Sequence, residues 1–206
     1  MTDVATLGAR SVSRETMARL RIYEALLRKW NPTINLVSRS TLEDVWSRHF
    51  RDSAQLYDLA GPGWSNWADL GSGGGFPGLV IAIMAAESRP GTTITLVESD
   101  QRKATFLRTV AYETGLTLKV LADRAESLAP LAVDVLSARA LAPLERLMSF
   151  AERHLAPDGV ALFPKGVNHA AELRQALEAW RFSHDAAVSE TDPSAVVYSI
   201  KGILRA

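Results

Sequence analysis

A glycine-rich stretch at residues 67–78, with the sequence WADLGSGGGFPG, constrains the fold of this chain more than any other feature. An apolar segment with an acid is followed by five glycines within residues 71–78, where the backbone can lie flat against a ligand. Pro77 then precedes an apolar run over residues 79–86, and proline suits the first turn of a helix because its missing N–H costs nothing there. A strand, a flexible turn and a helix in this order predict a site for a nucleotide-containing cofactor.

Two cofactor signatures fit this stretch. Residues 73–78 match the dinucleotide pattern G-x-G-x-x-G, whereas the segment from Asp69 to Gly73 matches the acid-x-Gly-x-Gly pattern of S-adenosylmethionine (SAM) enzymes. A carboxylate at the strand end repels a pyrophosphate but favours the sulfonium and ammonium groups of SAM, which carries no phosphate. The acid therefore favours SAM over NAD, and we expect Asp69, Gly71, Gly73 and Gly75 to form the cofactor site. A purely structural glycine turn is the alternative.

Strand-like and helix-like segments alternate after the breaker Gly-Pro-Gly at residues 61–63. Strands are expected at residues 67–70, 93–98, 118–121, 133–136, 160–163 and 195–200, and helices at residues 79–86, 102–114, 141–154 and 170–180. This alternation predicts an α/β, Rossmann-like domain over residues 61–206. It would have a parallel sheet, helices on both faces and ligands at the carboxyl ends of the strands.

Residues 1–60 are expected to form a helical N-terminal cap. Residues 1–12 show no clear period and are expected to be frayed, without regular structure. Ser13 is a plausible N-cap of a helix that ends at Asn31-Pro32. A second helix is expected over residues 42–56, after a capping box at residues 40–43. Basic residues of the cap are interleaved with acids, so its polar face fits either solvent or RNA.

Composition excludes several function classes. The chain has no cysteine, which rules out disulfides, thiolate metal sites and thiol nucleophiles. Its four histidines show no metal-ligand spacing, so we expect no metal and no covalent nucleophile. No membrane span and no leader are expected, and with zero formal net charge over 206 residues the chain is expected to be a soluble, cytoplasmic monomer.

Polar groups follow the expected strands where a ligand would lie. Glu98 stands about twenty residues past the glycine loop, where a carboxylate can accept both ribose hydroxyls of an adenosine. Ala125 and Glu126 lie on the next loop and can border the adenine. The alternatives are a surface acid for Glu98 and a simple helix start for Ala125 and Glu126.

Cations occupy the later strand ends. Arg139 stands between alanines, and its planar fork suits a phosphate, a carboxylate or a guanine edge. Lys165 lies on the turn Pro-Lys-Gly, where we expect a substrate phosphate contact. The cap supplies a second polar set, in which His49 is expected to be a satisfied, partly buried histidine rather than a catalytic one. That set comprises Asn35, Ser38, Arg39, Arg48 and His49.

Together these motifs resemble the bacterial family that makes 7-methylguanosine in 16S ribosomal RNA, ribosomal RNA small subunit methyltransferase G, also called glucose-inhibited division protein B. The motifs lie at residues 35–38, 48–53, 69–78, 98–103, 137–140 and 164–166. The resemblance implies a class I SAM-dependent methyltransferase with a mostly parallel, seven-stranded sheet. It also implies SAM contacts at Gly71, Phe76, Ala125, Glu126 and Arg139, and methylation of guanine 527, in ribosomal RNA numbering, in the 530 loop.

The expected partners are therefore SAM and either 16S ribosomal RNA or the small ribosomal subunit. Guanine N7 carries a free lone pair, so the reaction needs no strong general base. Arg139 and Lys165 are the expected catalytic residues, and Asn35, Arg39, Arg48 and His49 are expected to join them in binding RNA. Two alternatives stay open: a SAM-dependent methyltransferase of a small molecule or protein, and an NAD-linked oxidoreductase or nucleotide-binding module.

Overall fold

Seven strands form one sheet in the computed structural model, which describes residues 4–8 and 10–206. The strand order is β5-β4-β3-β6-β7-β9-β8, and all neighbours are parallel except β7 with β9 and β9 with β8. The strands are β3 (Asn66–Leu70), β4 (Thr93–Val97), β5 (Lys119–Leu121), β6 (Val133–Ala138), β7 (Leu155–Lys165), β8 (Trp180–Val188) and β9 (Val196–Arg205). The predicted mostly parallel, seven-stranded sheet is confirmed.

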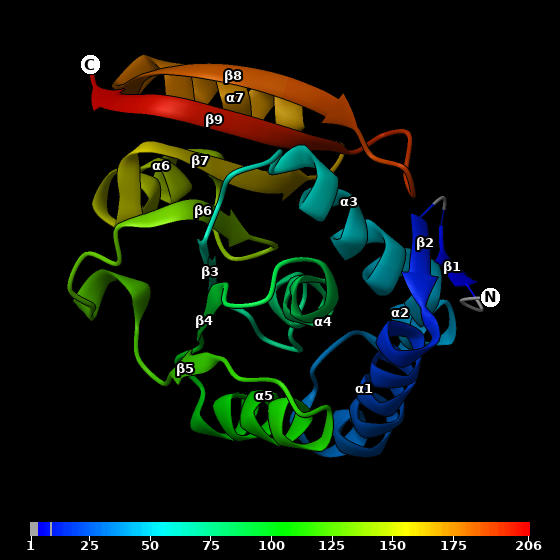
Figure 1. Cartoon of the computed structure of the whole chain (residues 1–206). Helices are drawn as coiled ribbons and strands as arrows, with labels where there is room; N and C mark the ends of the chain where they lie inside the picture. Colours follow the sequence, from blue (N-terminus) through cyan, green and yellow to red (C-terminus); the bar gives the residue numbers. More distant parts are fainter. Residues whose placement is uncertain (1–3, 9) are drawn as a thin grey trace.

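Helices cover both faces of this sheet, as expected. They are α4 (Gly78–Ser88), α5 (Gln101–Glu113), α6 (Leu144–His154) and α7 (His169–Ala179). Successive residues of a strand point to opposite faces, so Trp67 packs in one core cluster with α4 and α5, while Ala68 packs in another with α6 and α7. Figure 1 shows α4 on one side of the strands and α6 on the other.

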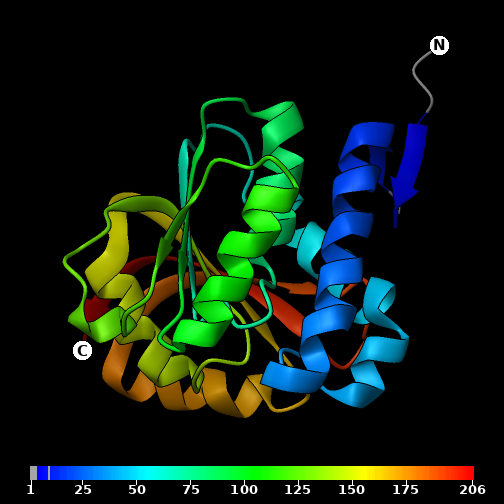
Figure 2. The same cartoon turned by 90° about the horizontal axis from the view of Figure 1, so that it is seen from below.

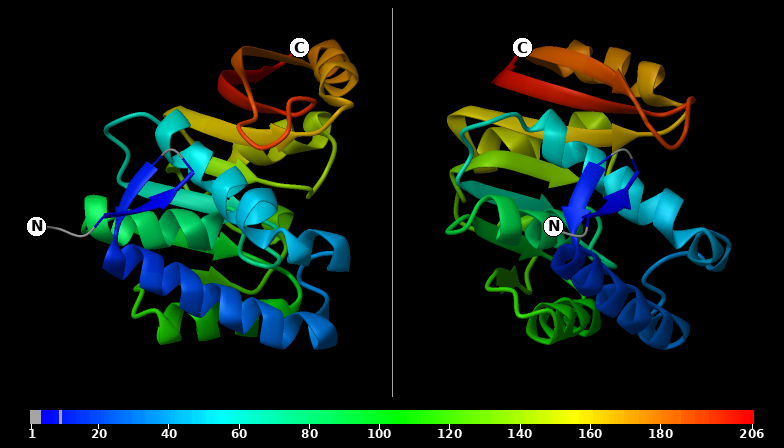
Figure 3. Two further views of the ribbon diagram at one scale, coloured as in Figure 1. Left: turned by 90° about the vertical axis from the view of Figure 1, so that its right-hand side faces the viewer. Right: turned by 45° about the vertical axis from the view of Figure 1, so that its right-hand side comes forward.

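The N-terminal cap contains more structure than the sequence predicted. Two short strands, β1 (Val4–Leu7) and β2 (Arg10–Ser13), pair antiparallel beside α1 (Arg14–Ile34), so the expectation of no regular structure before Ser13 is wrong for the described residues (Figure 3). Residues 1–3 and 9 lie outside that description. Tertiary contacts hold the hairpin: Leu7 is buried, and Arg10 forms ion pairs with Asp58 and Glu190.

Ser13 caps the first cap helix, as predicted, but the end of that helix and the course of the second helix differ from expectation. The first helix runs past Pro32 to Ile34, and Asn31 Oδ1 accepts the backbone N–H groups of Leu36 and Val37, each at 2.8 Å. The second is divided into α2 (Arg39–Glu43), a π-helical segment η1 (Trp46–Arg51) and α3 (Asp52–Leu59). Ser38 caps α2, one turn earlier than the expected start of that helix.

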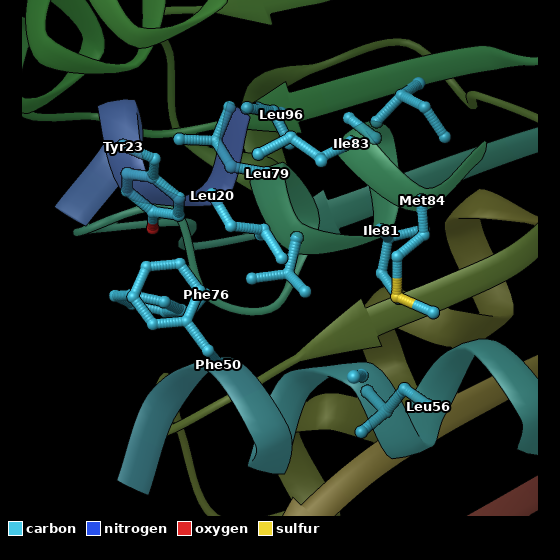
Figure 4. Packing of buried hydrophobic residues seen from close by; sticks show 14 of the residues in the cluster. Leu20, Tyr23, Phe50, Leu56, Phe76, Leu79, Ile81, Ile83, Met84 and Leu96 are labelled. Carbon is cyan, nitrogen blue, oxygen red and sulfur yellow. The ribbon is translucent and has the colours of Figure 1, made fainter. Parts of the chain in front are cut away.

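The cap and the sheet share one hydrophobic core. Tyr23 from α1 and Phe50 from η1 lie against Phe76 of the glycine-rich loop, with ring centroids 5.1–5.3 Å apart (Figure 4). Leu79 of α4 belongs to the same cluster. In Figure 2, α1 runs alongside the sheet domain and next to α5. The cap is therefore fixed against the edge of the sheet where the loops gather.

A late hairpin completes the sheet. The sequence predicted only one strand after residue 180, but β8 and β9 pair antiparallel from Val188↔Val196 to Trp180↔Arg205. The loop between them, residues 189–195, turns back toward the cap. Ser189 and Thr191 on this loop hydrogen-bond Asp52, the first residue of α3.

Candidate active site

The glycine-rich loop opens into a large cavity at the carboxyl ends of β3, β4, β6 and β7. Its volume is about 940 Å³. A second cavity of about 230 Å³ adjoins it. The first cavity brings together many of the predicted site residues, namely Gly71, Gly73, Phe76, Glu98, Arg48, His49, Arg139 and Lys165. The second is lined by Ala125 and Glu126, whereas Asp69, Gly75, Asn35 and Arg39 line neither.

Close packing explains two of the glycines in this loop, Gly75 and Gly78. A Cβ on Gly75 would lie 2.4 Å from Leu79 Cδ1 and 2.6 Å from the hydroxyl of Tyr23. That hydroxyl donates a hydrogen bond to the carbonyl of Gly74 at 2.5 Å. A Cβ on Gly78 would lie 2.4 Å from Leu96. Gly75 and Gly78 therefore let the loop pack onto the cap and the sheet, while Gly71 and Gly73 face the cavity.

Asp69 has a different position from the one predicted. Its side chain is buried: Oδ1 accepts a hydrogen bond from Ser137 Oγ at 2.7 Å, and Oδ2 accepts from the backbone N–H of Gly78 at 3.3 Å. Burial raises the pKa of this carboxyl to about 6, although the Ser137 hydrogen bond opposes the shift. Asp69 thus joins β3, β6 and the start of α4 behind the loop instead of facing the cavity.

The raised pKa of Asp69 predicts a pH-dependent stability difference. Because the folded state favours the neutral carboxyl, this site contributes stability below pH about 4 that is lost as the pH rises through about 6. The two pKa values differ by about 2 units, which sets an upper limit of about 3 kcal/mol. Thermal unfolding of the wild type and Asp69→Asn from pH 4 to pH 7 should show the wild type losing stability relative to the variant. A difference that is constant or grows with pH would contradict this assignment.

Glu98 lines the main cavity at the end of β4. It follows β4 directly and is 8% exposed. Its Oε2 accepts the backbone N–H of Gly73 at 2.8 Å, and its Oε1 accepts that of Asp100, also at 2.8 Å. Each oxygen keeps one more lone pair for a ligand hydroxyl. Glu98 therefore couples the glycine loop to the cavity wall.

Leu141 divides the two cavities. It lines both, and a Cβ on Gly71 would lie 2.5 Å from Leu141 Cδ1. On the far side, Ala125 and Glu126 form the start of a short 3₁₀ turn, η2 (Ala125–Ser127). The smaller cavity, with Val97 and Phe150 in its walls, suits a flat aromatic base.

Both Nη atoms of the Arg139 guanidinium donate hydrogen bonds to the protein. Nη1 donates to Asp52 Oδ2 and to the carbonyl of Arg48, each at 3.2 Å, and Nη2 donates to His49 Nδ1 at 2.8 Å. The guanidinium carbon lies 5.3 Å from the centre of the Phe76 ring. Only Nε has no protein partner among the residues that the structure describes. Arg139 therefore ties the end of β6 to the cap at the cavity wall.

These contacts fix the state of His49. An arginine can only donate, so Nδ1 of His49 must be the acceptor and Nε2 carries the proton that is donated to Thr41 Oγ1 at 2.9 Å. Burial, followed by the positive charges of Arg139 and Arg48, lowers the pKa of His49 to about 3. His49 is thus a satisfied, neutral histidine, as the sequence analysis expected.

Asp52 and the loop between β8 and β9 also line the main cavity, although the sequence did not predict them as site residues. Asp52 accepts from Arg139 with one oxygen and from Thr191 Oγ1, at 3.1 Å, with the other. Arg48 forms an ion pair with Asp192 at 3.4 Å. Asp52 lies within the motif at residues 48–53 and could have been predicted from it, whereas no sequence pattern marks the loop.

Lys165 is also engaged by the protein. Its ammonium donates to Glu172 Oε2 at 2.7 Å and to the carbonyl of Ala142 at 2.8 Å. Glu172 Oε2 further accepts the backbone N–H of Leu144 at 2.8 Å. The ammonium therefore fastens the segment that follows Arg139 to α7. Of the remaining predicted residues, Asn35 is the exposed C-cap of α1 and Arg39 is exposed at the start of α2.

No group of three or more histidine, aspartate or glutamate residues in the described part of the chain could hold a metal ion. Within the same residues, no helix combines the length and apolarity needed to cross a bilayer.

Comparisons with known proteins agree on one family. Residues 16–194 match the family model GidB, described as rRNA small subunit methyltransferase G. Proteins with the name ribosomal RNA small subunit methyltransferase G are similar over nearly their full length. The one from Ruegeria pomeroyi is 54% identical and covers 98% of both chains, and the one from Rhodospirillum centenum is 52% identical over 95% of this chain and 88% of its own.

Solved structures show the same fold at low identity. A methyltransferase from Geobacter sulfurreducens has a TM-score of 0.60 at 15% identity, covering 89% of this chain and 88% of its own. MtNAS in complex with S-adenosylmethionine has a TM-score of 0.58 at 15% identity, covering 90% and 75%. The chain thus has the fold of class I SAM-dependent methyltransferases.

Proposed function

We propose that this chain, which belongs to the family of ribosomal RNA small subunit methyltransferase G, transfers a methyl group from SAM to N7 of a guanine in the 530 loop of 16S ribosomal RNA. Family membership makes it a SAM-dependent enzyme that methylates ribosomal RNA. The N7 atom and the loop are the finer part of the proposal. We also propose that it acts as a monomer in the cytoplasm.

The residues around the two cavities fit SAM. Glu98 offers carboxylate oxygens for the ribose hydroxyls, and the smaller cavity offers the apolar side chains of Val97 and Phe150 and the backbone of Ala125 for the adenine. Gly71 and Gly73 let the cofactor approach the backbone. When bound, SAM supplies an electrophilic methyl group on a sulfonium sulfur. We assign the ribose contact to Glu98, the close approach of the cofactor to Gly71 and Gly73, and the adenine site to Ala125 and Glu126. Phe76 is assigned to the wall of the main cavity beside the cofactor.

Methylation of guanine N7 needs no general base, which fits the hydrogen bonding of the titratable groups beside Arg139. N7 has a free lone pair in its neutral base, so no residue has to remove a proton before methyl transfer. His49 and Asp52, the titratable groups beside Arg139, are both occupied by hydrogen bonds within the protein. The remaining task is to hold the base in line with the methyl group.

The observation that carries the proposal is the placement of Arg139. Its guanidinium is fixed by Asp52 and His49 in the wall of the main cavity, and its Nε is left for a ligand. Such a fixed cation suits either the O6/N7 edge of guanine or the carboxylate of the cofactor. In both cases it orients one reactant without moving during the reaction.

The charges around the cavity suggest where the RNA backbone approaches. Arg48 and Lys165 are paired with carboxylates, and so they offer little to a phosphate. Among the described residues, Lys29 on α1, Arg39 on α2 and Lys103 on α5 have no carboxylate partner, and Lys103 lines the main cavity. We place the flanking phosphates on this side, with the target base splayed out of any A-form helix.

A pair of variants distinguishes the two roles of Lys165. If Lys165 holds the segment after Arg139, Lys165→Met and Glu172→Ala should each lower kcat by roughly tenfold, because the first releases the carbonyl of Ala142 and the second releases the N–H of Leu144. Steady-state kinetics with RNA as the varied substrate measures this. A rise in KM for RNA in Lys165→Met alone would instead support the phosphate contact.

The proposed function is tested with labelled cofactor. The purified protein is titrated with SAM and with NADH by calorimetry. It is then incubated with tritiated SAM and either 16S ribosomal RNA or small subunits from a strain that lacks this methylation. We expect SAM to bind and the label to be recovered as 7-methylguanosine. Binding of SAM with no labelled RNA or subunit would favour a small-molecule or protein substrate, and binding of NADH alone would refute the cofactor assignment.

A further inference from the structure

We propose that His154, assisted by Arg153, positions the loop that receives the adenine of the cofactor, and that these two residues at the end of α6 therefore set the affinity for SAM. The proposal rests on SAM as the cofactor. Neither residue lines the two cavities, so the effect would act through the loop.

His154 is fully buried and makes one hydrogen bond. Its Nε2 lies 2.9 Å from the carbonyl oxygen of Ala125, the first residue of η2. Because a carbonyl can only accept, Nε2 must carry the proton, and the ring is held in one tautomer. The other nitrogen, Nδ1, is buried without a partner. Burial also lowers the pKa of His154, which keeps the ring neutral.

A buried histidine with one unpartnered nitrogen is costly for the core, so a structural role alone does not explain it. An apolar residue at the same place would avoid that cost but would leave the carbonyl of Ala125 almost unsatisfied, since its other contact, from the N–H of Leu128, is 3.4 Å long. The histidine therefore specifies where Ala125 lies. Ala125 in turn forms part of the wall of the smaller cavity.

Arg153 holds the other end of the same turn. Its Nε and Nη2 donate to the carbonyl of Leu128 at 2.9 Å and 2.6 Å. The turn η2 is thus attached to α6 at both ends, through His154 at Ala125 and through Arg153 at Leu128. The remaining side-chain contacts of Glu126, with Arg124 and Arg146, are exposed and 3.5–4.0 Å long. Within the described residues, α6 is the buried anchor of this loop.

The test is a series of substitutions at His154, read by calorimetric titration with SAM. In His154→Gln the side-chain amide places a donor at the same ε position and should keep Kd within about twofold of the wild type. In His154→Leu the donor is lost and Kd should rise about tenfold. 5′-Methylthioadenosine should lose affinity by the same factor, because the loop contacts the adenine end. At saturating SAM, kcat and the KM for RNA should be unchanged.

Two controls separate positioning from a general loss of stability. Leu147→Ala removes a buried side chain from the same helix and should lower the melting temperature without changing Kd for SAM. Arg153→Met, at an exposed position, should fold normally and raise Kd about threefold. Hydrogen exchange of the amides of residues 125–128 should quicken in both His154→Leu and Arg153→Met.

Three outcomes would overturn the proposal while SAM still binds the wild type: unchanged affinity in folded His154→Leu and Arg153→Met, no rescue by His154→Gln, or an equal loss in Leu147→Ala. Failure of the wild type to bind SAM would refute the cofactor assignment itself.

Discussion

Replacing Arg139 with alanine should lower kcat/KM for ribosomal RNA by about 100-fold or more, while the circular dichroism spectrum stays that of the wild type. The guanidinium is the group that meets both the cavity and the cap, through Asp52 and His49. Arg139→Lys should be nearly as inactive, because a lysine ammonium cannot make the two-armed contact. Methyl transfer from tritiated SAM to small subunits measures both variants.

Matched variants show whether the effect belongs to this site. Arg174→Ala removes an exposed arginine from α7 and should retain full activity. Asp52→Asn should fall between the two, since the amide keeps one acceptor for Nη1 but no charge. Retained turnover in a folded Arg139→Ala would remove Arg139 from the mechanism.

The centre of the fold could be predicted because its strands carry a strong local signal. β3, β4 and β6 are mostly apolar, are buried along most of their length and are followed by helices, a pattern that permits few topologies. β8 could not be predicted in the same way. It lies at the edge of the sheet, and most of its residues are exposed. Its alternation of apolar residues, Trp180 and Phe182 followed by Ala186 and Val188, is interrupted at His184, so the signal is weak.

Some residues of the candidate site could likewise be predicted from local sequence patterns, whereas others are placed only by tertiary packing. Glu98 could be predicted from two features of the sequence. It is the first residue after a strand, and it lies at the expected distance from the glycine loop. Asp69 lies inside β3, next to its last residue, and its side chain turns toward Ser137 and the start of α4, which only the packed structure reveals. The link between Asp52 and Thr191 joins residues 139 positions apart, and no local pattern encodes it.

Arg139 shows why these distant contacts matter for function. The cap contributes His49 and Asp52, which contact an arginine that the sheet presents, and the loop at residues 189–195 of the late hairpin hydrogen-bonds Asp52 in turn. The cap therefore forms part of the candidate active site. A variant with a loosened cap should lose turnover before it loses SAM binding, because Glu98 and Gly73 belong to the sheet domain.

Replacing Glu98 with glutamine should weaken SAM binding by about 100-fold. The carboxylate accepts the N–H groups of Gly73 and Asp100 with separate oxygens, and it has one lone pair left on each for a ribose hydroxyl. Glutamine has one acceptor oxygen, so its NH₂ group must face a backbone N–H, and one hydroxyl contact is lost. Calorimetric titration with S-adenosylhomocysteine gives the dissociation constant without turnover. Glu178→Gln, which changes an exposed carboxylate on α7 outside both cavities, is the matched control and should change Kd by less than about threefold.

A thermodynamic cycle with the 2′-deoxy analogue of S-adenosylhomocysteine identifies the group that Glu98 recognises. If the carboxylate binds the ribose, the wild type should lose about tenfold in affinity for the 2′-deoxy compound, whereas Glu98→Gln should hardly distinguish the two ligands. Equal discrimination by both proteins would mean that Glu98 only supports the loop through Gly73. The loss of affinity would then come from a displaced backbone, and faster hydrogen exchange of the Gly73 amide should accompany it.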